Sequence, residues 1–267
     1  MSQIAVISRK DAEREFHDAL RGADKADARL NANKKYYEIG RSNHAFSMER
    51  LARACRGRRV LDYCCGDGQN ALIAAAHGAT EVVGIDISPV SVMEANQQAR
   101  DRGLADRVRF EVMDAEAMTF PAGRFDVIVV AGVLHHLDLD AAYRELARVL
   151  ADDGEVICGE ALRHNVVIQA YRRLTPHLRT AWETEHILGR RQILLARRHF
   201  DVVRMDRFFH LATLAAVPFR NTPLFSPVLT VLEHVDRLLL RLPGLRWQAW
   251  QGLFTLARPK RQRTDAQ

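Results

Sequence analysis

The chain has little cysteine, only four in 267 residues, and none of the four is spaced as a metal-binding or redox pair. Cys55, Cys64, Cys65 and Cys158 include one adjacent pair but no C-x-x-C, so neither a disulfide framework nor a zinc site is expected. This pattern fits a protein of the reducing cytoplasm that binds no metal.

The sequence also lacks an apolar run of about 18 residues, the length that a membrane-spanning helix needs. The nearest approach is 208–232, where Arg220 is the only Lys, Arg, Asp or Glu and three prolines break the helix. The N-terminal residues lack an apolar core of signal-peptide length. We therefore expect no transmembrane segment and no signal peptide.

Acidic residues are fewer than basic ones, 33 against 39, which gives a formal net charge of +6. This excess fits nucleic acid, an anionic membrane surface or an acidic substrate, and it also fits a basic enzyme with none of these partners. There is no internal repeat, and the 48% hydrophobic content suffices for one sizeable core.

Strand-like and helix-like runs alternate from residue 58 onward. Strands are expected at 58–63, 81–86, 107–113, 125–131 and 154–160, and helices at 69–78, 89–102 and 139–150. Ser88 followed by Pro89 is typical of a helix start, and Gly103 of a helix end. This alternation predicts an α/β fold with a mainly parallel sheet and crossover helices.

The flanking segments are expected to be helical additions to this sheet. Residues 1–54 are expected to form an N-terminal helical cap that folds over the ligand crevice as a lid, and 55–267 the main domain. Two late strands, 200–207 and 247–256, bring the sheet to seven. The insertion between them, about 208–246, contains an apolar helix-like stretch. It is expected to be a substrate cover, a partner surface or a membrane-facing patch.

Acidic side chains follow three successive strands, as Asp62, Asp86 and Asp114. Ligands of open α/β sheets bind at these carboxyl ends. The turn Gly66-x-Gly68-x-x-Ala71 formally matches the dinucleotide fingerprint, but Asp62 would repel a pyrophosphate and attract a positively charged amino group. Because Ala131 and Gly132 are small, the end of the fourth strand can approach a ligand closely.

In VLDYCCGDG, GIDIS, MDAEAM and FDVIVVAGVLHHL, residues 58–160 resemble the class I S-adenosylmethionine-dependent methyltransferases of small molecules. The resemblance implies a Rossmann-like, seven-stranded, mostly parallel sheet with helices on both faces, and S-adenosylmethionine as cofactor. It implies that Asp86 binds the ribose, that Ile87 packs on adenine and that Asp114 and Ala115 read the adenine edge. The expected cofactor-binding residues are Asp62, Cys64, Gly66, Gly68, Asp86, Ile87, Asp114, Ala115 and Ala131.

Cys64 departs from the family, which usually has its first glycine at this position. A positive φ would carry a steric penalty for cysteine. We therefore expect an ordinary extended conformation there, with the Cys64 carbonyl available to the amino group of the cofactor.

Histidines are the expected catalytic residues, because a general base is needed when the acceptor keeps its proton at neutral pH. His135 and His136 follow the fourth strand, and His164 follows the fifth. Glu160 could instead orient one of them.

The LHH sequence resembles methyltransferases that act on quinones, lipids and natural products, whereas the aromatic turn of DNA amino methylation is missing. This argues against a nucleic-acid substrate, and the apolar region 208–240 suits an apolar or amphiphilic acceptor. Whether O, N or C is methylated stays open, as do the oligomeric state and peripheral membrane contact. The alternatives are an NAD-dependent oxidoreductase and a non-catalytic cofactor- or RNA-binding protein.

Overall fold

The computed structural model describes residues 8–22, 36, 38–178 and 181–261. The strands are β1 (Arg59–Tyr63), β2 (Glu81–Asp86), β3 (Val108–Val112), β4 (Phe125–Ala131), β5 (Leu150–Ala161), β6 (Phe200–Phe209) and β7 (Gln251–Pro259). The helices are α1 (Arg9–Gly22), α4 (Arg41–Cys55), α5 (Gln69–Ala76), α6 (Pro89–Asp101), α7 (Leu139–Val149), α8 (Val166–Leu174), α9 (Ala181–His186), α10 (Arg190–Leu195) and α11 (Phe225–Leu239). Short 3-10 turns, such as η1 (Leu134–His136) and η4 (Thr213–Phe219), lie between them.

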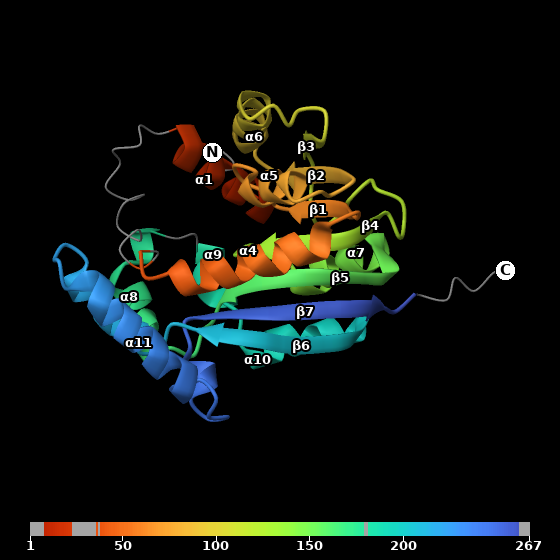
Figure 1. Ribbon diagram of the computed structural model, residues 1–267. Coiled ribbons are helices and arrows are strands. Elements are labelled where there is room, and N and C mark those ends of the chain that lie inside the picture. The colour runs from red at the N-terminus through yellow and green to blue at the C-terminus, as the bar shows by residue number, and fades with distance from the viewer. Residues whose placement is uncertain (1–7, 23–35, 37, 179–180, 262–267) are drawn as a thin grey trace, which may run out of the picture.

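The strands form one seven-stranded sheet in the order β3-β2-β1-β4-β5-β7-β6 (Figure 1). The pairs among β1 to β5 are parallel, and β7 runs antiparallel between β5 and β6. This confirms the predicted seven-stranded, mostly parallel sheet. Because β2 and β4 both pair in parallel with β1, the carboxyl ends of the three strands meet at one edge of the sheet.

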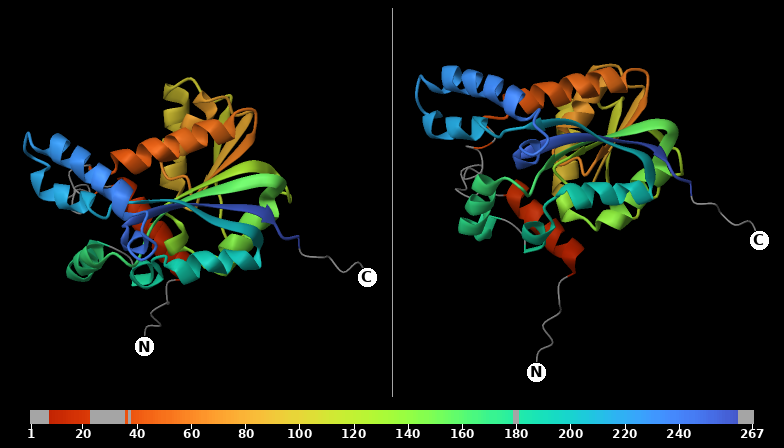
Figure 2. Two further views of the ribbon diagram at one scale, coloured as in Figure 1. Left: turned by 60° about the horizontal axis from the view of Figure 1, so that its bottom comes forward. Right: turned by 90° about the horizontal axis from the view of Figure 1, so that it is seen from below.

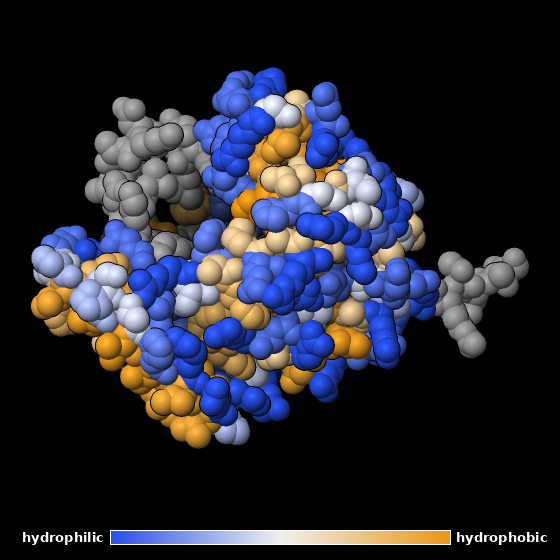
Figure 3. Space-filling model, in the orientation of Figure 1, coloured by the Kyte–Doolittle hydropathy of each residue, from blue (hydrophilic) through white to orange (hydrophobic). Residues whose placement is uncertain are grey.

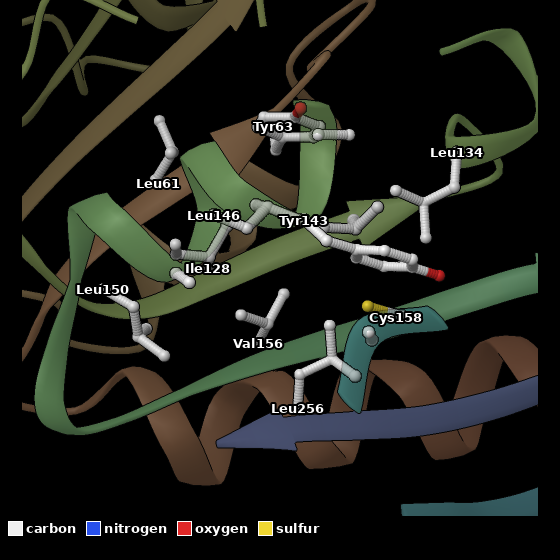
Figure 4. Close-up of a cluster of buried hydrophobic side chains, with 14 of the residues drawn as sticks. Leu61, Tyr63, Ile128, Leu134, Tyr143, Leu146, Leu150, Val156, Cys158 and Leu256 are labelled. Atoms are coloured by element: carbon white, nitrogen blue, oxygen red, sulfur yellow. The ribbon is translucent and has the colours of Figure 1, made fainter. Parts of the chain in front are cut away.

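Helices cover both faces of the sheet (Figure 2). Apolar side chains that alternate along the strands form one hydrophobic cluster on each face. On one face, Leu61 and Tyr63 of β1 pack with Tyr143 and Leu146 of α7 (Figure 4). On the other face, Val60 belongs to the cluster formed with α4, α5 and α6. The period of two along β1 therefore accounts for the helices that cover both faces, as predicted.

The predicted helix signals lie where they were expected. Ser88 caps α6 by accepting a hydrogen bond from the Ser91 N–H at 3.0 Å, and Pro89 occupies the first turn. Asp138 caps α7 in the same way through the Ala141 N–H, at 2.9 Å. Each cap satisfies a backbone donor that the helix leaves unpaired and contributes about 1 kcal/mol.

The N-terminal residues divide into two parts with different neighbours. The last turn of α4 belongs to the sheet layer, because Leu51, Ala54 and Cys55 are buried in the same cluster as β1 and α5. In contrast, α1 lies across the carboxyl ends of the strands, where its side chains line a cavity. The expected boundary at residue 54 stays a prediction.

The insertion between β6 and β7 is helical, as predicted, and consists mainly of η4 and α11 (Figure 1). Leu214 of η4, Leu229 of α11 and Trp250 share a small hydrophobic cluster with Ile168 of α8. The two main clusters lie elsewhere, so the insertion has a core of its own. Within the described ranges, each helix is too short or too polar to cross a bilayer.

Candidate active site

A cavity of about 330 Å³ lies at the carboxyl ends of β1, β2 and β4. Seven of the nine predicted cofactor-binding residues line it, namely Cys64, Gly66, Asp86, Ile87, Asp114, Ala115 and Ala131. They come from four segments far apart in the sequence. The structure therefore brings together most of the residues that the family resemblance selected.

The turn after β1 forms the floor of the cavity and alternates its backbone conformation. Cys64, Gly66 and Gly68 all have positive φ, at 55°, 54° and 78°. The expectation of an extended Cys64 is therefore wrong. The reason lies in the turn, where the Cys65 N–H donates to the Ile85 carbonyl at 2.8 Å and the chain must reverse within a few residues. Cysteine accepts here a conformation that costs a non-glycine residue about 1–2 kcal/mol.

Gly68 does not line the cavity but starts α5 in the left-handed conformation. A Cβ atom at this position would lie 2.5 Å from Cζ of Phe110. We expect Gly68→Ala to reduce the free energy of unfolding by about 2–4 kcal/mol, since the left-handed penalty and the overpacking of a buried ring add. Urea denaturation measures the loss.

Gly103→Ala is the matched control, because Gly103 also has a positive φ, 65°, but no atom lies within 4 Å of the added Cβ. Gly103→Ala should reduce the free energy of unfolding only by the penalty of the left-handed conformation, about 1 kcal/mol. Equal losses in the two variants would contradict the close approach of Phe110.

Asp62 is buried beneath the cavity and does not line it. Its carboxylate accepts a hydrogen bond from the Ala71 N–H at 3.0 Å, and the Asn70 side chain lies at 3.4 Å. Burial raises the pKa of Asp62 to about 7, although both donors oppose the shift. Asn70 lines the cavity and contacts Asp62, so Asp62 would reach a ligand in the cavity only through Asn70. The contact of Asp62 with the Ala71 N–H caps the start of α5.

The raised pKa of Asp62 predicts how stability changes with pH. The folded state binds this proton more tightly than the unfolded state, whose pKa is 3.8, so Asp62 costs stability as the pH rises from 3.8 to about 7. Asp62→Asn keeps an acceptor for Ala71 and removes the titration. From about pH 5 to about pH 8, the variant should gain on the order of 2 kcal/mol relative to the wild type. Urea denaturation at a series of pH values measures this difference. A difference in the free energy of unfolding that stays constant with pH would contradict a raised pKa of Asp62.

Asp86 and Asp114 present their carboxylates to the cavity. Asp86 is 8% exposed, and its two oxygens accept hydrogen bonds from the Gly66 and Ser88 N–H groups, both at 2.9 Å. One oxygen of Asp114 accepts from the Glu116 N–H at 2.9 Å. An ionised carboxylate has about four lone-pair sites, so both groups keep capacity for ligand hydroxyl or amino groups.

Helix α1 covers this cavity through charged contacts. Arg9 pairs with Glu116 and donates to the His136 carbonyl at 2.6 Å, while Lys10 lies 2.6 Å from an Asp114 oxygen. The side chains of Arg9, Lys10, Glu13 and His17 line the cavity. The lid was predicted, but these residues were not. The spacing of Glu13 and His17, four residues apart on one helix, was the available signal.

Glu160 orients His135, the first of the two histidines that follow β4. One of its oxygens accepts the N–H groups of Val133 and Leu134, both at 2.8 Å, and the other lies 3.0 Å from Nδ1 of His135. Because a carboxylate only accepts, Nδ1 of His135 is the donor. This contact confirms the expectation that Glu160 orients one of the histidines. His135 is buried and does not line the cavity.

His136 does line the cavity. Its Nδ1 donates to Glu13 of α1 at 2.9 Å, which leaves Nε2 as the nitrogen that can accept a proton. Burial lowers the pKa of His136, but the hydrogen bond and charge of Glu13 outweigh it, and the pKa is raised above its ordinary value. Glu13, His17 and His136 also offer possible metal-ligand atoms within 4.8 Å of one another, a grouping that the cysteine spacing did not reveal.

The structure does not bring His164 to the cavity. This side chain is exposed and contacts Trp247 at a ring distance of 6.2 Å, next to a different hollow of the surface. Partial burial of the ring and the positive charge of Arg163 lower the pKa of His164. His164 lies away from the cavity because β5 extends to Ala161 and the chain then continues toward β7 and not toward β4.

Comparison with known proteins identifies the central part of the chain. Residues 60–154 match the family model described as a methyltransferase domain. The chain is 38% identical over 107 residues to the 27-O-demethylrifamycin SV methyltransferase of Amycolatopsis mediterranei. It is 42% identical over 103 residues to the demethylmenaquinone methyltransferase of Thermus thermophilus. These alignments cover 40% and 38% of this chain, and 39% and 46% of the relatives, so the chain spans less than half of each relative's length.

Solved structures resemble the chain over nearly its whole length. The geranyl diphosphate C-methyltransferase of Streptomyces coelicolor superimposes with a TM-score of 0.62 and 16% identity, over 95% of this chain and 99% of the other. The cyclase SpnF superimposes with a TM-score of 0.58 and 22% identity, over 97% and 99%. At these identities the likeness concerns the fold. Residues 60–154 thus match a methyltransferase domain, and they lie inside a fold that a solved methyltransferase shares.

Proposed function

We propose that this chain transfers a methyl group from S-adenosylmethionine to a small-molecule acceptor. The observation that carries the proposal is the single cavity lined by Asp86, Ile87, Asp114 and Ala115, which come from the ends of β2 and β3. Its donor set suits the cofactor, because carboxylates accept from hydroxyl and amino groups and Ile87 offers an apolar surface to adenine. S-adenosylmethionine would supply the electrophilic methyl group.

Each cofactor residue then has a role that its position allows. Asp86 would accept the two ribose hydroxyls, and Asp114 with Ala115 would read the adenine edge. Gly66 and Cys64, with positive φ, would let the backbone approach the methionine end closely. Asp62 would act from below through α5, since its carboxylate faces the Ala71 N–H and not the cavity.

His136 is the histidine best placed to serve as general base. It lines the cavity, and Glu13 holds its Nδ1–H so that Nε2 can take the acceptor's proton. His135 would be a positioning residue, held by Glu160 behind it. Most of the remaining rate would come from holding the two reactants in line and away from water.

We propose a natural-product, quinone-like or lipid-like acceptor, as suits small-molecule biosynthesis. This rests on the names of the relatives, which act on a rifamycin and on demethylmenaquinone, and on the apolar insertion beside the sheet. A cytoplasmic location is part of the same proposal.

Calorimetric titration with S-adenosylhomocysteine and with NAD tests the cofactor. Binding of the first and not of the second supports the proposal, whereas the reverse would favour the oxidoreductase alternative. For the acceptor, cells that express the chain should accumulate a metabolite heavier by one CH2 group than its precursor, as mass spectrometry can show. The cyclase SpnF shows why this second step is needed, since the same fold hosts another reaction.

A further inference from the structure

Exposed apolar side chains gather on the insertion between β6 and β7. Of the eleven most exposed large apolar side chains in the described residues, six lie between 219 and 245. They are Phe219, Leu224, Val231, Leu238, Leu242 and Leu245. Figure 3 shows hydrophobic side chains concentrated at the lower left, where Figure 1 places α11. We call residues 219–246 the α11 surface.

These side chains form a stripe that the fold does not use. Leu224, Val231 and Leu238 are seven residues apart and therefore lie on one side of the helix. Their side chains are 56%, 62% and 64% exposed, and that of Leu242, four residues further on, is 51% exposed. The packing of α11 onto η4 uses a different side, on which Leu229 is buried. The apolar face of α11 is thus wider than its own packing requires.

Arginines lie next to the stripe at the C-terminal end of α11 and just after it. Arg237, Arg241 and Arg246 line a hollow of about 910 Å³ between α11, β6 and α10, together with Arg190, Arg204 and Arg207. The three acids of this hollow are engaged. Asp236 accepts the backbone N–H groups that follow β6, Glu233 pairs with Arg41 and Asp206 pairs with Arg204. Among the residues that the structure describes, Arg237, Arg241 and Arg246 form no ion pair, so this hollow carries a net positive charge.

We propose that the α11 surface docks on a bilayer that contains anionic phospholipids. The exposed leucines enter the interfacial region, and the arginines at the hollow meet the lipid phosphates. This is the arrangement of an amphipathic helix that lies in the membrane plane, and it needs no spanning segment. A nucleic acid would match the arginines but would offer no partner to the leucine stripe.

The position of α11 relates this docking to the cavity. Strands β5 and β6 both run antiparallel to β7 and so point in one direction, and α11 lies beyond the carboxyl end of β6 (Figure 1). The cavity also lies at carboxyl ends of the sheet. Docking therefore turns the cavity side of the sheet toward the bilayer and not away from it. The inference does not depend on methyl transfer and is tested without cofactor.

Flotation of the full chain with vesicles tests the proposal. Vesicles of equimolar phosphatidylcholine and phosphatidylglycerol should bind the wild type at least about tenfold better than phosphatidylcholine alone. The double variant Leu238→Gln/Leu242→Gln should lose binding to both compositions. The double variant Arg237→Gln/Arg241→Gln should bind anionic vesicles about thirtyfold more weakly, because each arginine near an anionic surface contributes about 1 kcal/mol, or roughly fivefold in affinity.

Matched controls separate this surface from general hydrophobicity and charge. Met93→Gln/Val112→Gln removes two exposed apolar side chains elsewhere, and Arg107→Gln/Arg144→Gln removes two exposed arginines elsewhere. Both should bind as the wild type does. Absence of wild-type binding, or an unchanged affinity in the leucine variant, would overturn the proposal. A dimer in light scattering that the leucine variant abolishes would also overturn it, in favour of a second copy of the chain.

Discussion

Asp86→Ala is expected to weaken the binding of S-adenosylhomocysteine about a hundredfold, which is about 2.7 kcal/mol. The carboxylate of Asp86 has a fixed direction, because the N–H groups of Gly66 and Ser88 hold its two oxygens at 2.9 Å. In the proposed complex it accepts both ribose hydroxyls, and a hydrogen bond to a charged group contributes about 1.5–3 kcal/mol. Calorimetric titration measures the change directly.

Asp106→Ala is the control, since Asp106 is an exposed acid in the turn before β3. It should bind the ligand as tightly as the wild type. Because Asp86 also holds the turn through Gly66, urea denaturation should first establish that Asp86→Ala is folded. A folded Asp86→Ala protein with wild-type affinity would remove the basis of the cofactor site.

His136→Ala is expected to lower kcat by about a hundredfold or more, while S-adenosylhomocysteine binds nearly as before, because a positioned general base contributes roughly 10²–10⁴ in rate. This holds for an acceptor that keeps its proton at neutral pH. The measurement is the rate of methyl incorporation into the acceptor found by mass spectrometry. His164→Ala is the control, since His164 is exposed and lies away from the cavity, and its rate should be unchanged.

The partner of His136 adds a pH signature to this prediction. Burial lowers the pKa of His136, but Glu13 outweighs it and raises the pKa, so the free base should form, and kcat should rise, at a higher pH than for an ordinary histidine. Glu13→Gln removes the charge and should move the rising limb of the pH profile to lower pH. If His136→Ala keeps the full rate, the acceptor is already deprotonated or positioning alone suffices.

The sheet and most of the residues that line its cavity could be predicted from the sequence because their signals are local. The period of two in β1, the cap at Ser88 and the acids after β2 and β3 each occupy a few neighbouring residues. Parallel pairing then brings the strand ends together without further information. His164 shows where this reasoning fails. It also follows a strand, but the chain after β5 turns toward β7, so His164 does not reach the cavity.

Contacts between distant segments could not be predicted in the same way. Glu13 lies 123 residues from His136, and the sequence between them does not indicate that α1 will deliver a carboxylate to that ring. Cys64 illustrates a second limit, because its preference for negative φ is weaker than the requirement of the turn that Gly66 and Gly68 share. In both cases the tertiary structure decides between choices that are close in energy.

The charged contacts of α1 have a consequence for the speed of repeated turnover. In the proposed function, the spent cofactor would leave a cavity lined by Arg9 and Lys10, whose ion pairs with Glu116 and Asp114 hold the helix over it. Partly exposed ion pairs weaken as ions in solution screen them. We therefore expect added salt to speed product release and to weaken binding of the incoming cofactor, so that turnover would be fastest at an intermediate ionic strength.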